Sequence, residues 1–512
     1  METIAAEKKS HARTFWSIGA AVVAMLIFAG WWGIHSLSAI AHERVQRALK
    51  EDFASDVDLQ DFRIKLFPRV GIEGQGLTLR YKGRTDLPPL IRIRSFSGAT
   101  SLIGLLSRPV HIRNLRMEGL QITVPPAPER HQGGGAIGVH ESQKPKRFVI
   151  DNLVADGTAL TVLPKTPEKE PLKWDIRRLT LSGAGPDSVM SFNATLRNAK
   201  PPGDIHAVGQ FGPWQKDDVG GTPLSANYTF RDADLSVFRG IAGILSSQGN
   251  FHGALERIEV DGTTDVPNFT VKVSGNPVDL KTQFHAIVDG TDGNTWLQPV
   301  NAQFGRSSVV AQGSVAGAKG SKKTVTLDVH VADARVEDML RLGVKGGEPV
   351  MTGAIGFHAK LVIPPGDVDV VQKMKLAGGF EIQSAHFTKT NIQEKVNKLS
   401  HSAKGEPRAP ETGMVASNFN GQFTLDRGTI SFRGLAFDAP GIHVALTGDY
   451  GLQDEHLNFQ GTAALQAKLS QTTTGFKSFL LKALDPFFEK KNAGAVVPFK
   501  ITGTREHPSF RP

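Results

Sequence analysis

Apolar and polar residues alternate along most of this chain, in short runs separated by glycine or proline. Residues 77–81, 91–94 and 120–124 are clear examples. Successive side chains of a β-strand point to opposite faces, so this period of two is typical of antiparallel strands with one buried face. The 54 glycines and 29 prolines suit the many turns that such strands need. We therefore expect a mainly β fold.

Two pairs of segments resemble each other within the chain. Residues 112–124 match residues 150–162 position by position, with Gly119 and Gly157 at equivalent places, and a weaker copy starts at Ile176. Residues 258–275 match residues 430–448 with one inserted residue. We interpret both as repeated hairpin modules that pack mainly on their neighbours in an extended sheet. Chance similarity among β-hairpins is the alternative.

The charge pattern excludes some classes of function. The net charge of +9 comes from 59 basic and 50 acidic residues that are spread along the strands, so nucleic-acid binding is not expected. A diffuse basic excess suits work near anionic lipid head groups, although a solvated strand face accounts for the same residues. The chain has no cysteine, which excludes disulfides, thiol nucleophiles and thiolate metal sites.

Residues 15–34 form an uncharged, apolar run in which Ser17 is the one polar side chain. At about 1.5 Å per residue a helix of this length crosses roughly 30 Å of hydrocarbon. We expect a cytoplasmic tail at residues 1–14, a transmembrane helix at 15–34 and translocation of the rest. A signal peptide cleaved near residues 39–41 is the alternative, but the run is longer than a typical signal core.

Four-residue spacing of Val45, Leu49 and Phe53 predicts a short amphipathic helix over residues 41–53 that covers the first strands. Further helices are expected at 102–106, 235–246, 336–342, 391–399 and 476–489. The last has a wide apolar face, and we hypothesise that it docks on lipid or on a partner protein through Phe479, Phe487 and Phe488. Ordinary core packing is the alternative for this helix.

No catalytic signature is present in the sequence. The nucleophile elbow, the phosphate-binding loop and the zinc-protease helix motif do not occur, and the 16 histidines are scattered singly. Residues 289–294 are acidic, but Thr291 and Gly293 occupy positions where a calcium loop needs oxygen ligands, so a β-turn is the better interpretation. We expect neither an enzyme, nor a cofactor, nor a metal site.

Motifs at both ends of the chain resemble the AsmA family of bacterial envelope proteins. At the N-terminal end these are residues 66–70 (LFPRV), 101–106 (SLIGLL) and 118–120. At the C-terminal end they are residues 284–291 (FHAIVDGT) and the stretch from 428 to 508. The resemblance implies an N-terminal region at 41–198 and a C-terminal region at 205–512.

The same resemblance implies a fold and a function. The fold would be an elongated, twisted antiparallel sheet with a few short helices that forms an apolar groove behind a membrane anchor. The function would be conduction of phospholipid between inner and outer membranes by a single-pass inner-membrane protein, with the bulk of the chain in the periplasm. Membrane phospholipids, and an envelope protein at the C-terminal end, are the expected partners. The alternative is a scaffold for outer-membrane assembly without lipid transport.

Strand alternation selects candidate residues for the groove lining. Phe269, Val271 and Val273 share one predicted face, while Thr270, Lys272 and Ser274 take the other. The matching segment places three further apolar residues in the same way, and these are Ile442, Val444 and Leu446. We hypothesise that these six apolar side chains line the groove.

Overall fold

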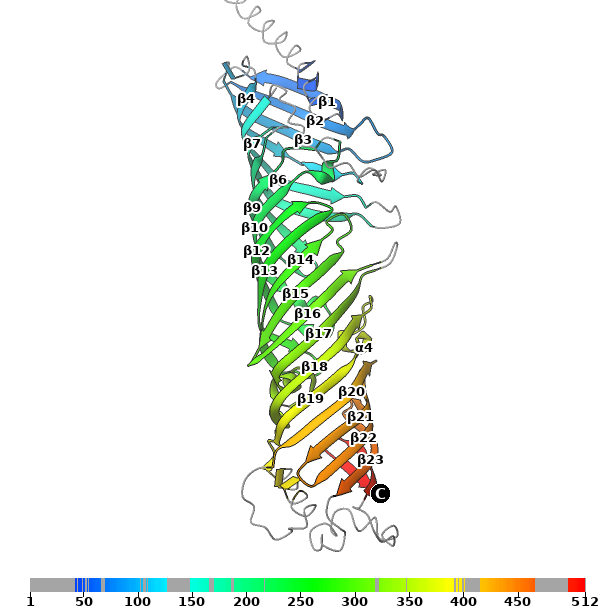
Figure 1. Ribbon diagram of the computed structural model, residues 1–512. Coiled ribbons are helices and arrows are strands. Elements are labelled where there is room, and N and C mark those ends of the chain that lie inside the picture. Colours follow the sequence, from blue (N-terminus) through cyan, green and yellow to red (C-terminus); the bar gives the residue numbers. More distant parts are fainter. Residues whose placement is uncertain are drawn as a thin grey trace, which may run out of the picture. The chain divides into compact units, whose positions relative to one another are not determined.

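The computed structural model of the chain describes residues 42–511, apart from internal gaps of which the longest are 127–147, 401–414 and 466–495. The predicted mainly β fold is confirmed, with 25 strands and few helices in the described residues (Figure 1). The chain divides into two units. The first comprises residues 1–165, 171–196 and 207–224, and the second comprises 166–170, 197–206 and 225–512.

The first unit is built on strands that place alternate side chains on a shared apolar face. They are β1 (Ser55–Lys65), β2 (Gly71–Tyr81), β3 (Ile91–Thr100), β4 (Val110–Glu118), β5 (Gln121–Val124), β6 (Phe148–Val162) and β7 (Leu172–Ala184). Antiparallel ladders join β1 to β2, β2 to β3, β3 to β4 and β6 to β7. The strands β8 (Met190–Ala199) and β9 (Pro202–Phe211) and the short helix η1 (Val219–Gly221) follow.

The first repeat is real but is not a pair of hairpins. The strands β4 and β5 run parallel to β6, with Ile112 opposite Ile150 and Ile122 opposite Leu160. Each copy therefore continues in one direction through its central glycine, which has a left-handed φ of 66° at Gly119 and 69° at Gly157. The predicted all-antiparallel sheet is wrong at these two pairings, because a left-handed glycine kinks the strand without reversing it.

The amphipathic helix predicted before the first strand is confirmed. The residues described between 42 and 50 are helical, and Val45, Leu49 and Phe53 pack against the apolar core of the first unit. The predicted transmembrane span at 15–34 lies outside the described residues. Among the residues that are described, no helix is both long and apolar enough to cross a bilayer.

The second unit consists mainly of strands in chain order, most of which are labelled in Figure 1. They are β10 (Leu224–Asp234), β11 (Ile241–Ala242), β12 (Ile244–Ala254), β13 (Arg257–Val271), β14 (Pro277–Val288), β15 (Thr295–Phe304), β16 (Ser307–Ala316), β17 (Thr324–Arg335), β18 (Met351–Ile363), β19 (Lys375–Phe387), β20 (Ser417–Asp426), β21 (Thr429–Ala439), β22 (Ile442–Gly451), β23 (His456–Leu465), β24 (Val496–Thr504) and β25 (Pro508–Arg511). From β12 onward each strand pairs antiparallel with the next.

The second predicted repeat does not hold in three dimensions. Residues 258–271 lie along the single strand β13, whereas the matching residues 430–446 turn back at Pro440 and form two strands, β21 and β22. The helix predicted at 235–246 is also wrong. Only η2 (Leu235–Val237) is helical there, and a turn, β11 and the start of β12 follow it.

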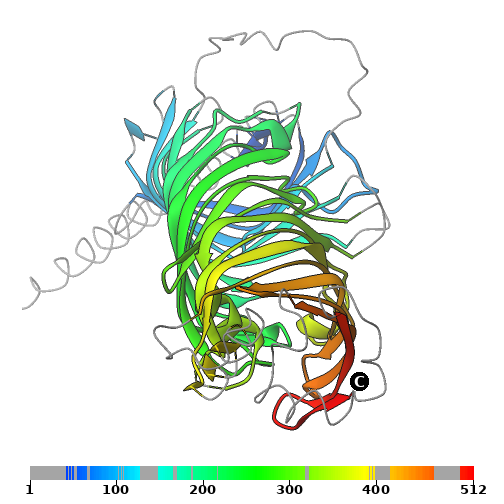
Figure 2. The same cartoon turned by 60° about the horizontal axis from the view of Figure 1, so that its bottom comes forward.

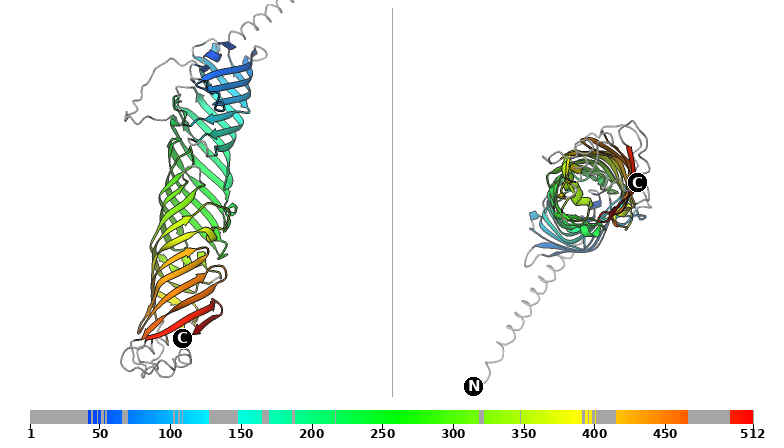
Figure 3. Two further views of the ribbon diagram at one scale, coloured as in Figure 1. Left: turned by 90° about the vertical axis from the view of Figure 1, so that its right-hand side faces the viewer. Right: turned by 90° about the horizontal axis from the view of Figure 1, so that it is seen from below.

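The sheet of the second unit curves, so that one of its faces is concave (Figures 2 and 3). The helix α3 (Val336–Gly343) confirms the prediction at 336–342 and lies against this face, where Val336, Met339 and Leu340 pack on residues of β16 to β20. It contacts β13 and β14 as well as β17 and β18. An eight-residue helix is only about 12 Å long, so it touches strands this far apart because the sheet curves around it.

The curvature of the second unit's sheet also brings opposite ends of its strands into contact. The helix α4 (Val370–Lys373), which sequence analysis missed, follows the C-terminal end of β18. Its Val370 N–H donates to Arg239 O at 2.8 Å, near the strand ends on the opposite side of the sheet. Val371 is buried there with Leu425 and Leu452, against Val271 from the far end of β13. We call this line of contacts the seam. Loops and side chains make it, without a strand ladder in the described residues.

Candidate functional site

The most distinctive site in the described residues is an apolar cavity of about 330 Å³ inside the first unit. This volume is within the range of roughly 300–1,000 Å³ that is usual for small-molecule sites. Every side chain of its lining is hydrophobic or aromatic. The lining includes Leu59, Phe62, Ile72, Leu77, Leu79, Ile93, Phe96, Ile112, Leu115, Met117, Ile122, Ile150, Leu153, Leu179, Leu181 and Met190.

Strand alternation explains why so many apolar residues converge on one space. Along β4, Leu115 and Met117 line the cavity. The alternate residues Arg116 and Glu118 are exposed on the other face of the strand. The parallel repeat adds Ile150 and Leu153 from β6, which are in register with Ile112 and Leu115. The repeated sequence therefore duplicates the apolar wall on two adjacent strands.

A helix and a loop cover the cavity on the side away from the sheet. Val45, Leu49 and Phe53 come from the helix over residues 42–50 and the turn after it. Trp214 comes from the loop after β9, and its ring lies 5.8 Å from the ring of Phe53 and 6.0 Å from that of Phe211, edge-on to both. Such edge-to-face contacts are a favourable geometry for aromatic rings.

The loop that carries Trp214 is fastened to the turn after β2. The Tyr81 hydroxyl donates to Asp217 O at 2.8 Å, and Lys82 Nζ lies 3.5 Å from Asp217 Oδ1. The Gln215 N–H donates to the hydroxyl of Thr222, which is itself buried. Both Asp217 contacts are exposed, and exposed ion pairs contribute little, about 0–1 kcal/mol. The part of the loop at Asp217 is thus held by contacts that contribute little, whereas the Gln215–Thr222 hydrogen bond holds the part next to Trp214.

The second unit presents another apolar feature, a row of phenylalanine rings on its concave face. Phe380, Phe423, Phe432 and Phe459 come from four strands, and the ring of Phe380 lies 6.1 Å from that of Phe423 and 6.2 Å from that of Phe432. Glycines face these rings, since Gly421 is opposite Phe380 and Gly378 is opposite Phe423. A glycine leaves room for the ring that faces it, and the first three of these rings remain half-buried.

Five of the six residues predicted to line a groove belong to two separate clusters in the second unit. Val271 and Val273 pack in the seam, and Val273 together with buried Ser274 lies beyond the end of β13, so the predicted alternation stops there. Ile442, Val444 and Leu446 belong to another cluster, in which Val396 and Val415 pack against buried Ile442 and Val444. Phe269 is half-buried. Their role as groove lining remains a prediction.

Val396 belongs to the helix predicted at 391–399, which is confirmed at the positions that the structure describes. The predicted docking residues Phe479, Phe487 and Phe488 lie outside the described residues. Sequence analysis missed the cavity of the first unit, although its signal was present in the alternating apolar residues of β1 to β7. The sequence does not show that these strands and the helix over 42–50 border a common space.

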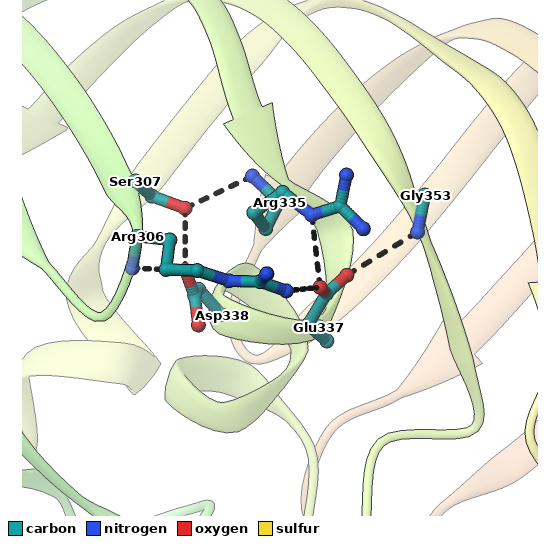
Figure 4. Close-up of polar contacts among 6 residues, drawn as sticks. All are labelled: Arg306, Ser307, Arg335, Glu337, Asp338 and Gly353. Carbon is teal, nitrogen blue, oxygen red and sulfur yellow. Dashed lines mark hydrogen bonds and ion pairs between the residues drawn. The ribbon is translucent and has the colours of Figure 1, made fainter.

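A polar network of the second unit surrounds the first turn of α3 (Figure 4). Glu337 accepts hydrogen bonds from Arg306 at 2.8 Å, Arg335 at 2.9 Å and the Gly353 N–H at 3.2 Å. Asp338 accepts from the Arg306 N–H and from the Ser307 hydroxyl, both at 2.8 Å. These carboxylates are engaged by the protein itself, so we assign the network to anchoring α3 on the sheet.

Burial and hydrogen bonding act in opposite directions on Glu337. Burial alone would raise the pKa of this carboxyl. The hydrogen bonds that it accepts from backbone N–H groups and from Arg335, together with the charge of Arg335, outweigh burial and lower the pKa below the ordinary value. Glu337 is therefore a structural anion.

Neither the metal-ligating residues of the described chain nor comparison with known proteins indicates a second functional site. No group of three or more histidine, aspartate or glutamate side chains suited to a metal occurs in the described part of the chain. The acidic segment at 289–294 is a turn between β14 and β15, in which Asp289 accepts from the Thr291 N–H at 2.9 Å and Asp292 from the Asn294 N–H at 2.8 Å. Comparison with protein-family models, curated proteins and solved structures finds no match.

Proposed function

We propose that this chain is a membrane-anchored envelope protein that binds phospholipid through its acyl chains, with the cavity of the first unit as the binding site. The observation that carries the proposal is the lining of that cavity, which holds about 330 Å³ among hydrophobic and aromatic side chains. A space of this kind favours ligands that bring hydrocarbon and few polar groups.

The free energy available from such a site suits a lipid carrier. Each methylene group that moves from water into an apolar site contributes about 0.8 kcal/mol. The half-buried phenylalanines of the second unit offer a further apolar surface in the same chain. Transfer of lipid between inner and outer membranes, and membership of the AsmA family, extend this proposal on the strength of the sequence resemblance.

The proposal is tested by site-specific photo-crosslinking in the full chain within cells. A diazirine amino acid at position 117 replaces Met117, which faces the cavity, and the matched control is at position 118, where Glu118 is exposed on the opposite face. Crosslinked phospholipid is expected at 117 and not at 118. Capture of protein but no lipid at 117 would instead favour a scaffold for outer-membrane assembly.

The proposed location requires its own test. The apolar run at residues 15–34 motivates a single-pass inner-membrane protein with its bulk in the periplasm. A reporter enzyme that is active only in the periplasm, fused after Arg511, is expected to be active. Activity only of a cytoplasmic reporter at the same position would contradict this orientation.

A further inference from the structure

Among the described residues that line the cavity of the first unit, Trp214 carries the one side-chain nitrogen or oxygen atom. Its indole Nε1 is buried and has no hydrogen-bond partner among the described residues. Buried polar groups in proteins are nearly always hydrogen-bonded, because leaving a buried donor unsatisfied is costly. This donor therefore calls for a specific explanation.

The position of Trp214 suggests what the missing partner is. The ring sits at the boundary between the cavity and its cover, held edge-on by Phe53 and Phe211. Nε1 itself has almost no exposed surface, so the ring has to turn for a ligand in the cavity to reach it. The Asp217 contacts that fasten one part of the loop are exposed and contribute little. A ligand that fills the cavity with hydrocarbon and places one acceptor at its end would satisfy the donor.

We propose that Trp214 Nε1 donates a hydrogen bond to the carbonyl oxygen of a fatty acyl ester whose chain occupies the cavity. This inference rests on the proposed lipid-binding function and adds a specificity determinant to it. An ester suits the site better than a free carboxylate, because a single neutral donor leaves most of a carboxylate's acceptor sites unpaired and a buried charge is costly.

The test compares three ligands of similar chain length on the full-length protein in a fluorinated surfactant, which does not mix with hydrocarbon. They are methyl palmitate, heptadecane and palmitate at pH 8, measured by displacement of an apolar fluorescent probe. In the variant, 3-benzothienylalanine replaces Trp214, since it keeps the bicyclic ring and lacks the N–H. Trp174→Phe provides the control, because Trp174 is a half-buried tryptophan of the same unit that does not line the cavity.

The variant is expected to bind methyl palmitate about 3- to 10-fold more weakly than the natural chain, the effect of one neutral hydrogen bond. Heptadecane affinity should not change, and Trp174→Phe should alter neither. A methyl palmitate labelled with ¹³C at its carbonyl adds a spectroscopic readout. Its infrared carbonyl band should lie at lower frequency when bound to the natural chain than when bound to the variant.

Each contrary result has a distinct meaning. Equal losses for ester and alkane, no loss for the ester, or an unshifted carbonyl band would overturn the role of Trp214 while leaving lipid binding intact. Tighter binding of palmitate than of the ester would overturn the ester assignment in favour of a carboxylate site. Failure of the natural chain to bind any of the three ligands would overturn the proposed function itself.

Discussion

Asn114 and Asn152 lie opposite each other in the parallel pair of β4 and β6, with Asn152 Nδ2 3.5 Å from Asn114 Oδ1. Ser182 extends the row into β7 by donating to Asn152 Oδ1 at 3.3 Å. The row lies on the exposed face, behind the wall of the cavity. Equivalent positions of the sequence repeat are thus neighbours in space, which keeps polar residues on one face and the lining on the other.

The kink that makes this register possible can be tested at Gly157. Its φ is 69°, and a Cβ atom at this position would meet no other atom within 4 Å. Gly157→Ala should therefore lower the free energy of unfolding of the first unit by roughly 1–2 kcal/mol through backbone strain alone. Gly157→Asn should cost less, since asparagine tolerates this conformation. Chemical denaturation measures both, and equal losses would contradict a purely conformational cause.

The stability of the second unit should depend on pH through Glu337. The pKa of Glu337 is lowered in the folded chain, so the folded state favours the anion. Its contribution is fully present above the unfolded pKa of about 4.3 and is lost as pH falls towards the folded value. Glu337→Gln should destabilise β17 and β18 at pH 7 and flatten their pH dependence below about 4.3. Hydrogen exchange of peptides from these strands measures both effects, and an unchanged pH profile would contradict the assignment.

The contribution of the seam can be measured with two neighbouring valines. Val371 is 4% exposed and lies in the seam, whereas Val368 is 58% exposed. Val371→Ala should cost about 1–3 kcal/mol, from lost apolar burial and the cavity that remains, and it should speed hydrogen exchange at the end of β13. Val368→Ala should stay within about 0.5 kcal/mol. Similar effects of the two variants would show that the seam does not stabilise the unit.

Adjacent glycines of β19 test how closely this strand approaches the backbone of β18. A Cβ atom on Gly378 would lie 2.1 Å from the backbone oxygen of His358, whereas the nearest atoms to a Cβ atom on Gly379 would be 3.6 Å away. Gly378→Ala should therefore destabilise the second unit by about 1–3 kcal/mol, the usual cost of overpacking. Gly379→Ala should be close to neutral. Thermal unfolding of the two variants compares them directly, and equal midpoints would be inconsistent with this packing.

The sequence alone determined the class of fold and several local elements. Period-two alternation predicted the strands, and the spacing of Val45, Leu49 and Phe53 predicted the helix that packs on them. These predictions succeeded because side-chain periodicity and the burial of one face are local properties. The same locality explains the correct prediction of α3 and of the turn at 289–294.

Tertiary structure alone decided how those elements are joined. The repeat around Gly119 and Gly157 looked like two hairpins because glycine marks a turn as readily as a kink, and only the pairing with β6 distinguishes the two. The segments 258–271 and 430–446 share a pattern but differ in path, since one passes through its proline and the other turns at it.

The sequence also does not show that the helix and strands of the first unit border one cavity, or that opposite strand ends of the second unit are in contact. Alternation assigns a residue such as Met117 to an apolar face, but it does not show whether that face meets another layer, a helix or open space. Whether Val271 is packed against Val371 depends on sheet curvature, which is the accumulated twist of many strands. Burial of one face is specified residue by residue, whereas what covers that face is a property of the whole unit.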